Sequence, residues 1–179
     1  LWILTILAET AARTGDTKIS EKHFLEARRL GVNDHYLLGA YADFLLDQGR
    51  APEVITLLQR ETRADGLLLR LTLAEQALHL PAGKDHTAEL AARFAAGRER
   101  GTRVHVREEA RFTLTLLHDS QTALTLAQAN WEIQKEPWDA RLLLETALAV
   151  GSRDAARPVI AWLRTNHVED MRLQQLVAQ

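Results

Sequence analysis

The stretch HYLLGAYADFLLDQGRAPEVITLLQRETR, residues 35–63, holds two apolar helical runs separated by a short polar break. His35–Gln48 is expected to form a first helix, and Pro52–Arg63 a second one. Gly49-Arg50-Ala51-Pro52 forms the turn between them, and Pro52 suits the first turn of a helix because its missing N–H has no partner to lose there. The stretch therefore predicts a helical hairpin.

The same arrangement recurs at a fixed spacing. Gly15, Gly49 and Gly83 are 34 residues apart, and Gly151 follows after twice that distance. Each of these glycines follows an apolar run and opens a polar break. A period of 34 residues with paired helices is typical of a solenoid of stacked helix–turn–helix units. We therefore predict an all-α, right-handed superhelix of about five hairpins in one domain, with approximate repeats 1–34, 35–68, 69–102, 103–136 and 137–170 and a partial repeat 171–179.

Local signals place the individual helices. The expected ranges are 1–14, 18–30, 67–80, 85–98, 138–150 and 153–165, besides the two quoted above. Gly31 tolerates the left-handed conformation of a helix C-cap, and Asn33-Asp34 offers N-cap side chains to the following helix. Asp85 or Thr87 is expected to cap the helix after the Gly83 turn. The period slips at 97–103, where a longer connector is expected.

These residues resemble the tetratricopeptide repeat family across essentially the whole chain. With Gly15 as position 15, the small residue of position 20 falls on Ser20, Val54, Ala88, Ala123 and Ala156. The aromatic of position 24 falls on Phe24 and Leu58, and the alanine of position 27 on Ala27 and Ala95 but on Glu61 in the second repeat. The terminal proline occurs only as Pro137. The resemblance implies a concave groove that accepts an extended peptide or a partner helix.

Composition excludes several classes of protein. Net charge is −2 and the pI is about 6.4, which argues against a general binder of nucleic acid or anionic membranes. No apolar run approaches the roughly 18 residues that cross a bilayer. The absence of cysteine removes disulfides and thiolate chemistry. Because the chain begins with Leu1 and its only methionine is Met171, we expect a fragment of a longer protein. A soluble protein of the bacterial cytoplasm or periplasm fits this composition, which does not choose between the two.

Catalytic motifs are not found in the sequence. It has no phosphate-binding glycine loop, no His-Glu-x-x-His and no pair of histidines four residues apart for a metal. Two carboxylate pairs, Asp43 with Asp47 and Glu108 with Glu109, have the chemistry of an acid and a base, but an open groove offers no dry pocket to separate their pKa values. We therefore predict a protein that is not an enzyme and has neither cofactor nor metal. The basic stretch Arg93–Arg111, with Arg103 in it, is expected to be a solvated connector.

The resemblance places positions 2, 5, 6, 9, 12 and 13 of each first helix toward the groove. Acidic residues recur at position 9, and large side chains at position 2, namely Trp2, Tyr36, Arg70 and Trp138. The hypothesis is an acidic ladder beside an aromatic edge, suited to a peptide that carries lysine or arginine. The predicted groove residues are Glu9, Arg13, Tyr36, Asp43, Asp47, Arg70, Glu109, Arg141 and Glu145.

Structural roles compete with this hypothesis. Arg141 and Glu145 are four residues apart and are able to pair with each other, and Arg70 is able to reach Asp43 or Asp47 on the preceding helix. Trp2 and Trp138 fit either the core or the groove. Reversing Asp43 and Asp47 to lysine is expected to abolish binding without unfolding the protein.

The function that the sequence favours is a scaffold for protein–protein interaction with a protein or peptide partner. The alternative is a regulatory, non-catalytic module of a larger enzyme or signalling protein. A basic partner and a homo-oligomer both stay open, whereas nucleic acid and a membrane span in this segment are not expected.

Overall fold

The computed structural model describes residues 1–101 and 105–179, and all regular secondary structure in these residues is helical. They form two compact units, Leu1–Glu99 and Arg100–Gln179, which we describe one at a time. The helices of the first unit are α1 (Trp2–Arg13), α2 (Thr17–Arg29), α3 (His35–Asp47), α4 (Ala51–Leu58), α5 (Asp65–Ala77) and α6 (Ala82–Glu99). Those of the second unit are α7 (Val106–Thr115), α8 (Ser120–Ile133), α9 (Pro137–Ala149), α10 (Arg153–Thr165) and α11 (Met171–Val177).

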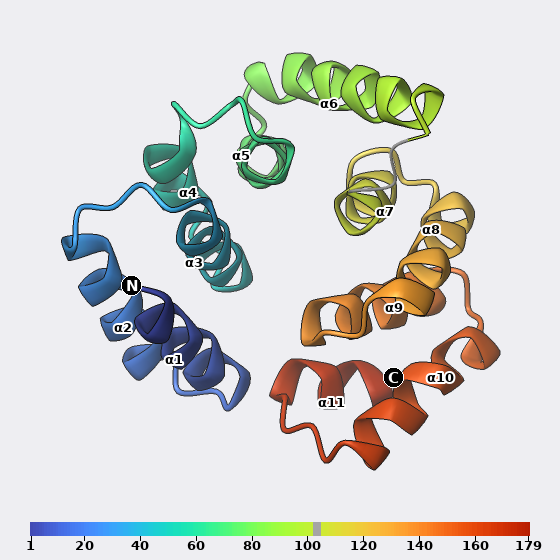
Figure 1. Cartoon of the computed structure of the whole chain (residues 1–179). Helices are drawn as coiled ribbons and strands as arrows, with labels where there is room; N and C mark the ends of the chain where they lie inside the picture. The colour runs from blue at the N-terminus through green and yellow to red at the C-terminus, as the bar shows by residue number, and fades with distance from the viewer. Residues whose placement is uncertain (102–104) are drawn as a thin grey trace. The chain divides into compact units, whose positions relative to one another are not determined.

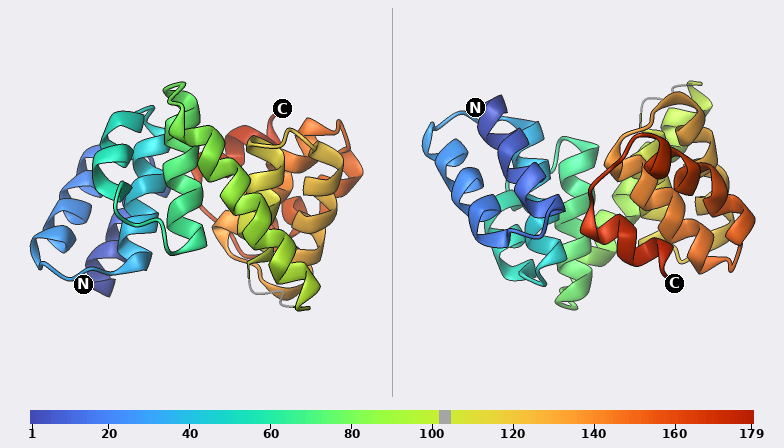
Figure 2. Two further views of the ribbon diagram at one scale, coloured as in Figure 1. Left: turned by 90° about the horizontal axis from the view of Figure 1, so that it is seen from above. Right: turned by 90° about the horizontal axis from the view of Figure 1, so that it is seen from below.

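The first unit consists of three consecutive helical hairpins. α1 packs on α2, α3 on α4 and α5 on α6 (Figure 1). The first helices also contact one another, α1 with α3 and α3 with α5, so that they form one layer. Each second helix packs in turn on the first helix of the next hairpin, α2 on α3 and α4 on α5. Figure 2 shows the same neighbours from two further directions. The expected pairing of helices within hairpins is thus confirmed for this unit.

Aromatic rings join the first two hairpins. The ring centroid of Phe24 in α2 lies 5.1 Å from that of Tyr41 and 5.5 Å from that of Phe44, both in α3. All three side chains are buried, and burial is the main reason that the pKa of Tyr41 lies above its usual value. Aromatic pairs at these distances add to the free energy gained from burying their area. The interface between hairpins is therefore part of the core and not a wet contact.

The second unit repeats this pattern in its own five helices. α7 packs on α8, α9 on both α8 and α10, and α11 on α9. Its core gathers leucines and alanines of α9 around Trp131 of α8, whose ring meets that of Trp162 edge to face at 5.4 Å. Pro158 lies inside α10, and Pro137 occupies the first turn of α9. Leucine, alanine and a few aromatic rings thus fill both cores.

A residue in the left-handed conformation ends most of these helices. After α1, α3 and α9 it is Gly15, Gly49 and Gly151, with φ of 87°, 69° and 70°. The amide of the residue after each glycine bonds to the carbonyl five positions before it, as in Arg50 N to Leu45 O at 2.9 Å, which satisfies a carbonyl at the helix end. The turn prediction at these three glycines is confirmed.

The turn prediction at Gly83 is wrong. His79 carries the left-handed conformation after α5, with φ of 54°, and Leu80 N bonds to Glu75 O at 2.9 Å. α6 already begins at Ala82, so that Gly83 is helical and buried. A Cβ at Gly83 would stand 3.2 Å from the Cβ of Glu75, which shows that this glycine permits a close approach of α6 to α5. Neither Asp85 nor Thr87 caps α6, since both lie within it.

The displaced turn changes the repeat boundaries. α4 ends at Leu58, not at Arg63, and α5 begins at Asp65, so the third hairpin starts before the expected boundary at residue 69. Ala88, which the 34-residue count assigned to a close-packed position, is exposed. Ser20, Val54 and Ala123 are buried as expected. The expected connector is helical up to Glu99, and Thr102–Val104, including Arg103, lie outside the described residues.

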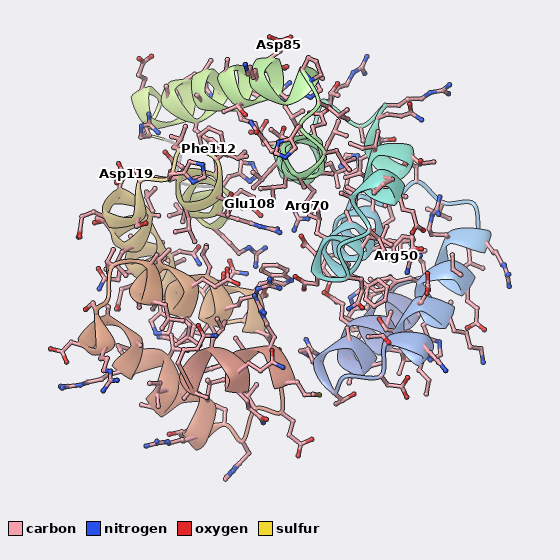
Figure 3. The ribbon with its side chains drawn as sticks, turned by 180° about the vertical axis from the view of Figure 1, so that it is seen from behind. Arg50, Arg70, Asp85, Glu108, Phe112 and Asp119 are labelled. Carbon is pink, nitrogen blue, oxygen red and sulfur yellow. The ribbon has the colours of Figure 1, made fainter. Side chains whose placement is uncertain are left out.

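Aspartate or serine side chains cap the starts of five of the described helices, α2, α3, α8, α10 and α11. Asp34 accepts from Leu37 N at 2.8 Å, as predicted, and Ser152 accepts from Ala155 N at 3.3 Å. Asp119, labelled in Figure 3, caps α8 by accepting from Thr122 N at 3.0 Å. Hydrogen bonds from the hydroxyl and the amide of Thr122 hold the pKa of Asp119 below its usual value. These caps explain why the helix starts could be located from the sequence.

Ser20 lies within α2, fully buried, and its hydroxyl has no hydrogen-bond partner. Replacing Ser20 with alanine is therefore expected to raise the free energy of unfolding by about 1 kcal/mol, since the fold no longer buries an unsatisfied hydroxyl. Urea denaturation followed by circular dichroism measures the change. Thr72→Val is the matched control, because the buried hydroxyl of Thr72 is bonded to Leu68 O at 2.7 Å and its removal brings no such gain. A Ser20→Ala protein that is no more stable than the wild type would contradict the prediction.

Candidate functional site

Six of the nine predicted groove residues lie on the layer of first helices in the unit Leu1–Glu99. Glu9 and Arg13 are on α1, Tyr36, Asp43 and Asp47 on α3, and Arg70 on α5. The hydroxyl of Tyr36 donates to Glu9 Oε2 at 2.5 Å, which links α3 to α1. The guanidinium of Arg13 bonds within its own helix, to Thr10 Oγ1 at 3.1 Å. The structure thus brings the side chains of α1 and α3 together at this layer.

Arg70 links α5 to α3. Its Nη2 lies 2.5 Å and its Nε 2.9 Å from Asp43 Oδ2, and the same group donates to the carbonyls of Gly39 and Gly66 at 3.1 and 2.7 Å. Figure 3 labels Arg70 on α5. The ion pair that the sequence suggested between Arg70 and Asp43 is confirmed. The carboxylate of Asp43 is only 5% exposed, so that Asp43 belongs to a buried cross-link between helices.

The residues of α3 that were expected to face the groove differ in their exposure. Tyr36 is half exposed and Asp47 is exposed, whereas Ala40 and Asp43 are buried. In α5, Ala74 is buried as well, although the 34-residue count placed it toward the groove. The reason is the displaced turn after α5. Arg70 lies four residues closer to His79, the left-handed residue behind its helix, than Tyr36 lies to Gly49. Arg70 therefore does not share the position of Trp2, Tyr36 and Trp138.

The other three predicted residues lie in the unit Arg100–Gln179. Glu109 is on α7, and Arg141 and Glu145 are on α9. Arg141 Nε donates to Glu145 Oε1 at 2.8 Å, so the competing structural interpretation of this pair is confirmed. Arg172 of α11 approaches the same oxygen at 3.7 Å. Three first helices carry a carboxylate at position 9, and these carboxylates are Glu9, Asp43 and Glu145. Each of the three is bound by a neighbouring side chain.

No family model, no curated protein and no solved structure matches this chain.

The sequence left open whether Trp138 lies in the core or in the groove. The guanidinium carbons of Arg111 and Arg141 lie 4.7 and 4.4 Å from its ring centroid, and the indole is partly exposed. Cations over an indole ring attract its electron-rich face. Arg141 follows Trp138 by three residues on one helix, a spacing that indicates contact. Arg111 comes from α7, and nothing in the sequence pattern pointed to it. Trp2, by contrast, is 67% exposed.

Two further charged clusters lie among the helices of the first unit. Arg50 bonds to Glu53 Oε1 and Glu21 Oε1, each at 2.6 Å, and the bond to Arg50 lowers the pKa of Glu53. Glu75 of α5 is buried and meets His86 Nδ1 of α6 at 2.7 Å. Both clusters join neighbouring helices, and neither brings a nucleophile to a second acid or base in an enclosed cavity.

Within residues 1–101 and 105–179, no three histidine, aspartate or glutamate side chains are placed to hold a metal ion. In the same ranges, no helix is both long and apolar enough to cross a bilayer. What the geometry does provide is a layer of contacting first helices, α1, α3 and α5, with side chains that bond from one helix to the next.

Proposed function

We propose that this chain is a non-enzymatic helical-repeat scaffold, of the tetratricopeptide type, that binds a peptide or a helix of a partner protein on the layer formed by α1, α3 and α5. The observation that carries the proposal is the pair of bonds between helices in this layer, Tyr36 to Glu9 and Arg70 to Asp43. They hold the backbone of three helices in fixed register before any ligand arrives. A preorganised surface loses less conformational entropy on binding, which favours affinity.

The exposed side chains of this layer define the ligand. Tyr36 offers a half-exposed aromatic ring, and Asp47 offers an exposed carboxylate on the same helix. Tyrosine supplies contact area at low entropic cost, and a carboxylate orients lysine or arginine. A basic peptide remains the proposed ligand, with Asp47 and Tyr36 as its contacts. Asp43 acts in this proposal as a support beneath them, because it is buried and bound to Arg70.

The test is selection of binding peptides from a displayed random library, followed by calorimetric titration of the selected peptides. Asp47→Lys is expected to weaken a selected basic peptide at least tenfold, because an attraction of about 1 kcal/mol at 4 Å in water becomes a repulsion of the same size. Asp154→Lys is the matched control: it makes the same charge change at a side chain of α10 that is 79% exposed. It is expected to leave the affinity unchanged.

Two results would contradict the proposal at different levels. If no peptide is selected with measurable affinity, the scaffold function itself fails. If peptides bind but Asp47→Lys and Asp154→Lys weaken them equally, binding takes place elsewhere on the molecule. Tyr36→Ala distinguishes the second case further, since it is expected to weaken the peptide without changing the charge.

A further inference from the structure

A cleft of about 310 Å³ lies between α8 and α10, which both pack on α9 (Figure 1). Its apolar lining comes from Trp131 of α8, Leu143 of α9, and Ala155 and Pro158 of α10. Trp131 and Leu143 are core residues, so the cleft reaches the core of the unit Arg100–Gln179. Ligand sites in proteins have volumes of about 300–1,000 Å³. A cleft at the lower end of this range suits a single side chain rather than a helix.

Two polar side chains of α8 also line the cleft. Gln128 and Glu132 are four residues apart and lie on one face of the helix. In the part of the chain that the structure describes, neither side chain takes part in a hydrogen bond or an ion pair. Glu132 lies in the last turn of α8, which contains no basic residue, so its charge adds to the negative end of the helix dipole. This arrangement favours a cation at the cleft.

Pro158 adds a backbone acceptor. A proline has no N–H, so the carbonyl of Asp154, four residues before it in α10, lacks the bond that a helix normally supplies. Both residues line the cleft. The carboxylate of Asp154, by contrast, is paired with Arg157 at 2.8 Å and is 79% exposed. The charge of the cleft therefore comes from Glu132, and Asp154 contributes its carbonyl.

We propose that the cleft between α8 and α10 binds an arginine side chain of a partner protein. A guanidinium has five N–H donors and no acceptor, which matches a carboxylate, an amide oxygen and a carbonyl. Its flat faces and its methylene stem pack on apolar walls such as Trp131 and Pro158. The chain itself already places a cation near this indole, since Lys135 Nζ lies 5.9 Å from the ring centroid of Trp131. None of the residues of the peptide site on α1, α3 and α5 takes part.

The experiment titrates the nitrogen-15-labelled chain with N-acetyl-arginine methylamide, which represents an arginine within a polypeptide. The chain has four tryptophans, and Trp131→Phe assigns the indole N–H signal of Trp131. This signal is expected to shift with a Kd in the millimolar range, as befits so small a ligand, together with the amides of residues 128–132 and 154–157. N-acetyl-citrulline methylamide has the same shape without the charge, and it is expected to bind about fivefold more weakly.

Three variants separate charge from space. Glu132→Gln keeps the shape of the cleft and is expected to weaken the arginine probe about fivefold, but not the citrulline probe. Glu169→Gln, the same change at another exposed glutamate of this unit, is the matched control and is expected to weaken neither. Ala129→Leu, at a partly exposed position in the lining of the cleft, is expected to abolish binding of both probes without changing the charge. Circular dichroism checks that each variant is folded.

Four results would overturn the proposal. The first is an unchanged Trp131 signal with the arginine probe, and the second is equal affinity for the two probes. The third is a set of shifts confined to the surroundings of Tyr36 and Asp47, which would place the arginine at the proposed peptide site and support the function of that site instead. The fourth is tighter binding of free arginine than of the blocked probe, since the occupant would then be the free amino acid and not a protein side chain.

Discussion

Arg70→Ala is expected to lower the free energy of unfolding of the unit Leu1–Glu99 by about 3–5 kcal/mol. The substitution leaves the carboxylate of Asp43 buried without its guanidinium, and it also removes the bonds to the carbonyls of Gly39 and Gly66. A buried charge without a counterion costs far more than the pair contributes when it is complete. Urea denaturation followed by circular dichroism measures the loss.

Two comparisons show whether the loss of stability comes from the unpaired carboxylate of Asp43. The double variant Arg70→Leu with Asp43→Leu is expected to recover most of the stability, since no unpaired charge stays in the interface. Arg157→Ala removes a guanidinium from a pair with Asp154 whose side chains are 78% and 79% exposed, and it is expected to change stability by less than about 1 kcal/mol. A double variant as unstable as Arg70→Ala would show that the carbonyl bonds or the packing of Arg70 carry the effect instead.

The ion pair between Arg70 and Asp43 also changes the expected result of a charge reversal at position 43. The sequence suggested that lysine at positions 43 and 47 abolishes binding and leaves the fold intact. Asp43→Lys would instead place two cations together in a buried interface, and we expect it to unfold the first unit. Asp47→Lys alone therefore tests the proposed peptide site, because Asp47 is exposed.

Helix positions were predictable because their causes are local. Asp34 and Pro52 mark helix starts through the chemistry of one turn, and Gly49 marks a helix end through its backbone freedom. The helix expected at 153–165 was located to the residue, as α10, for the same reason, since Gly151 and Ser152 stand in front of it. The pairing of these helices into hairpins followed from the short turns between them.

Which side chains meet across helices was less predictable. The acidic residues at position 9 recur as the pattern indicated, and Glu145 is bound by Arg141 of its own helix, but Glu9 and Asp43 are each bound by a side chain from another helix. Tyr36 reaches Glu9 across 27 residues of sequence, and Arg111 reaches Trp138 from a different helix. A pattern of residue types gives the position on a helix face, but the partner across the interface depends on the register of two helices, which only the fold determines.

Gly83 shows how a regular spacing was misinterpreted. It lies 34 residues after Gly49, yet its φ is not left-handed and it stands within α6. A glycine is required both where φ is positive and where two helices approach closely, and the sequence shows the same letter for either cause. The left-handed position belongs to His79, and histidine is a residue that a search for turn glycines passes over.

The two causes predict different responses to substitution. At Gly83, a Cβ would stand 3.2 Å from Glu75 Cβ and 3.4 Å from Gln76 N, so the added atoms must displace α6 from α5. Gly83→Val is expected to destabilise the first unit by about 2–3 kcal/mol through overpacking. Gly83→Ala is expected to cost much less, because the better helix propensity of alanine, worth about 1 kcal/mol, offsets the smaller displacement.

Gly49 supplies the matched comparison, since its φ is +69° and a Cβ there would meet nothing within 4 Å. Alanine at position 49 is expected to destabilise by about 1–2 kcal/mol and valine by more, because the left-handed backbone penalises any Cβ and a β-branched one most. Alanine is therefore expected to cost less at Gly83 than at Gly49, and urea denaturation of the four variants measures this difference. A loss for Gly83→Ala as large as that for Gly49→Ala would mean that backbone conformation, not the approach of α6 to the buried Glu75, is what requires glycine at position 83.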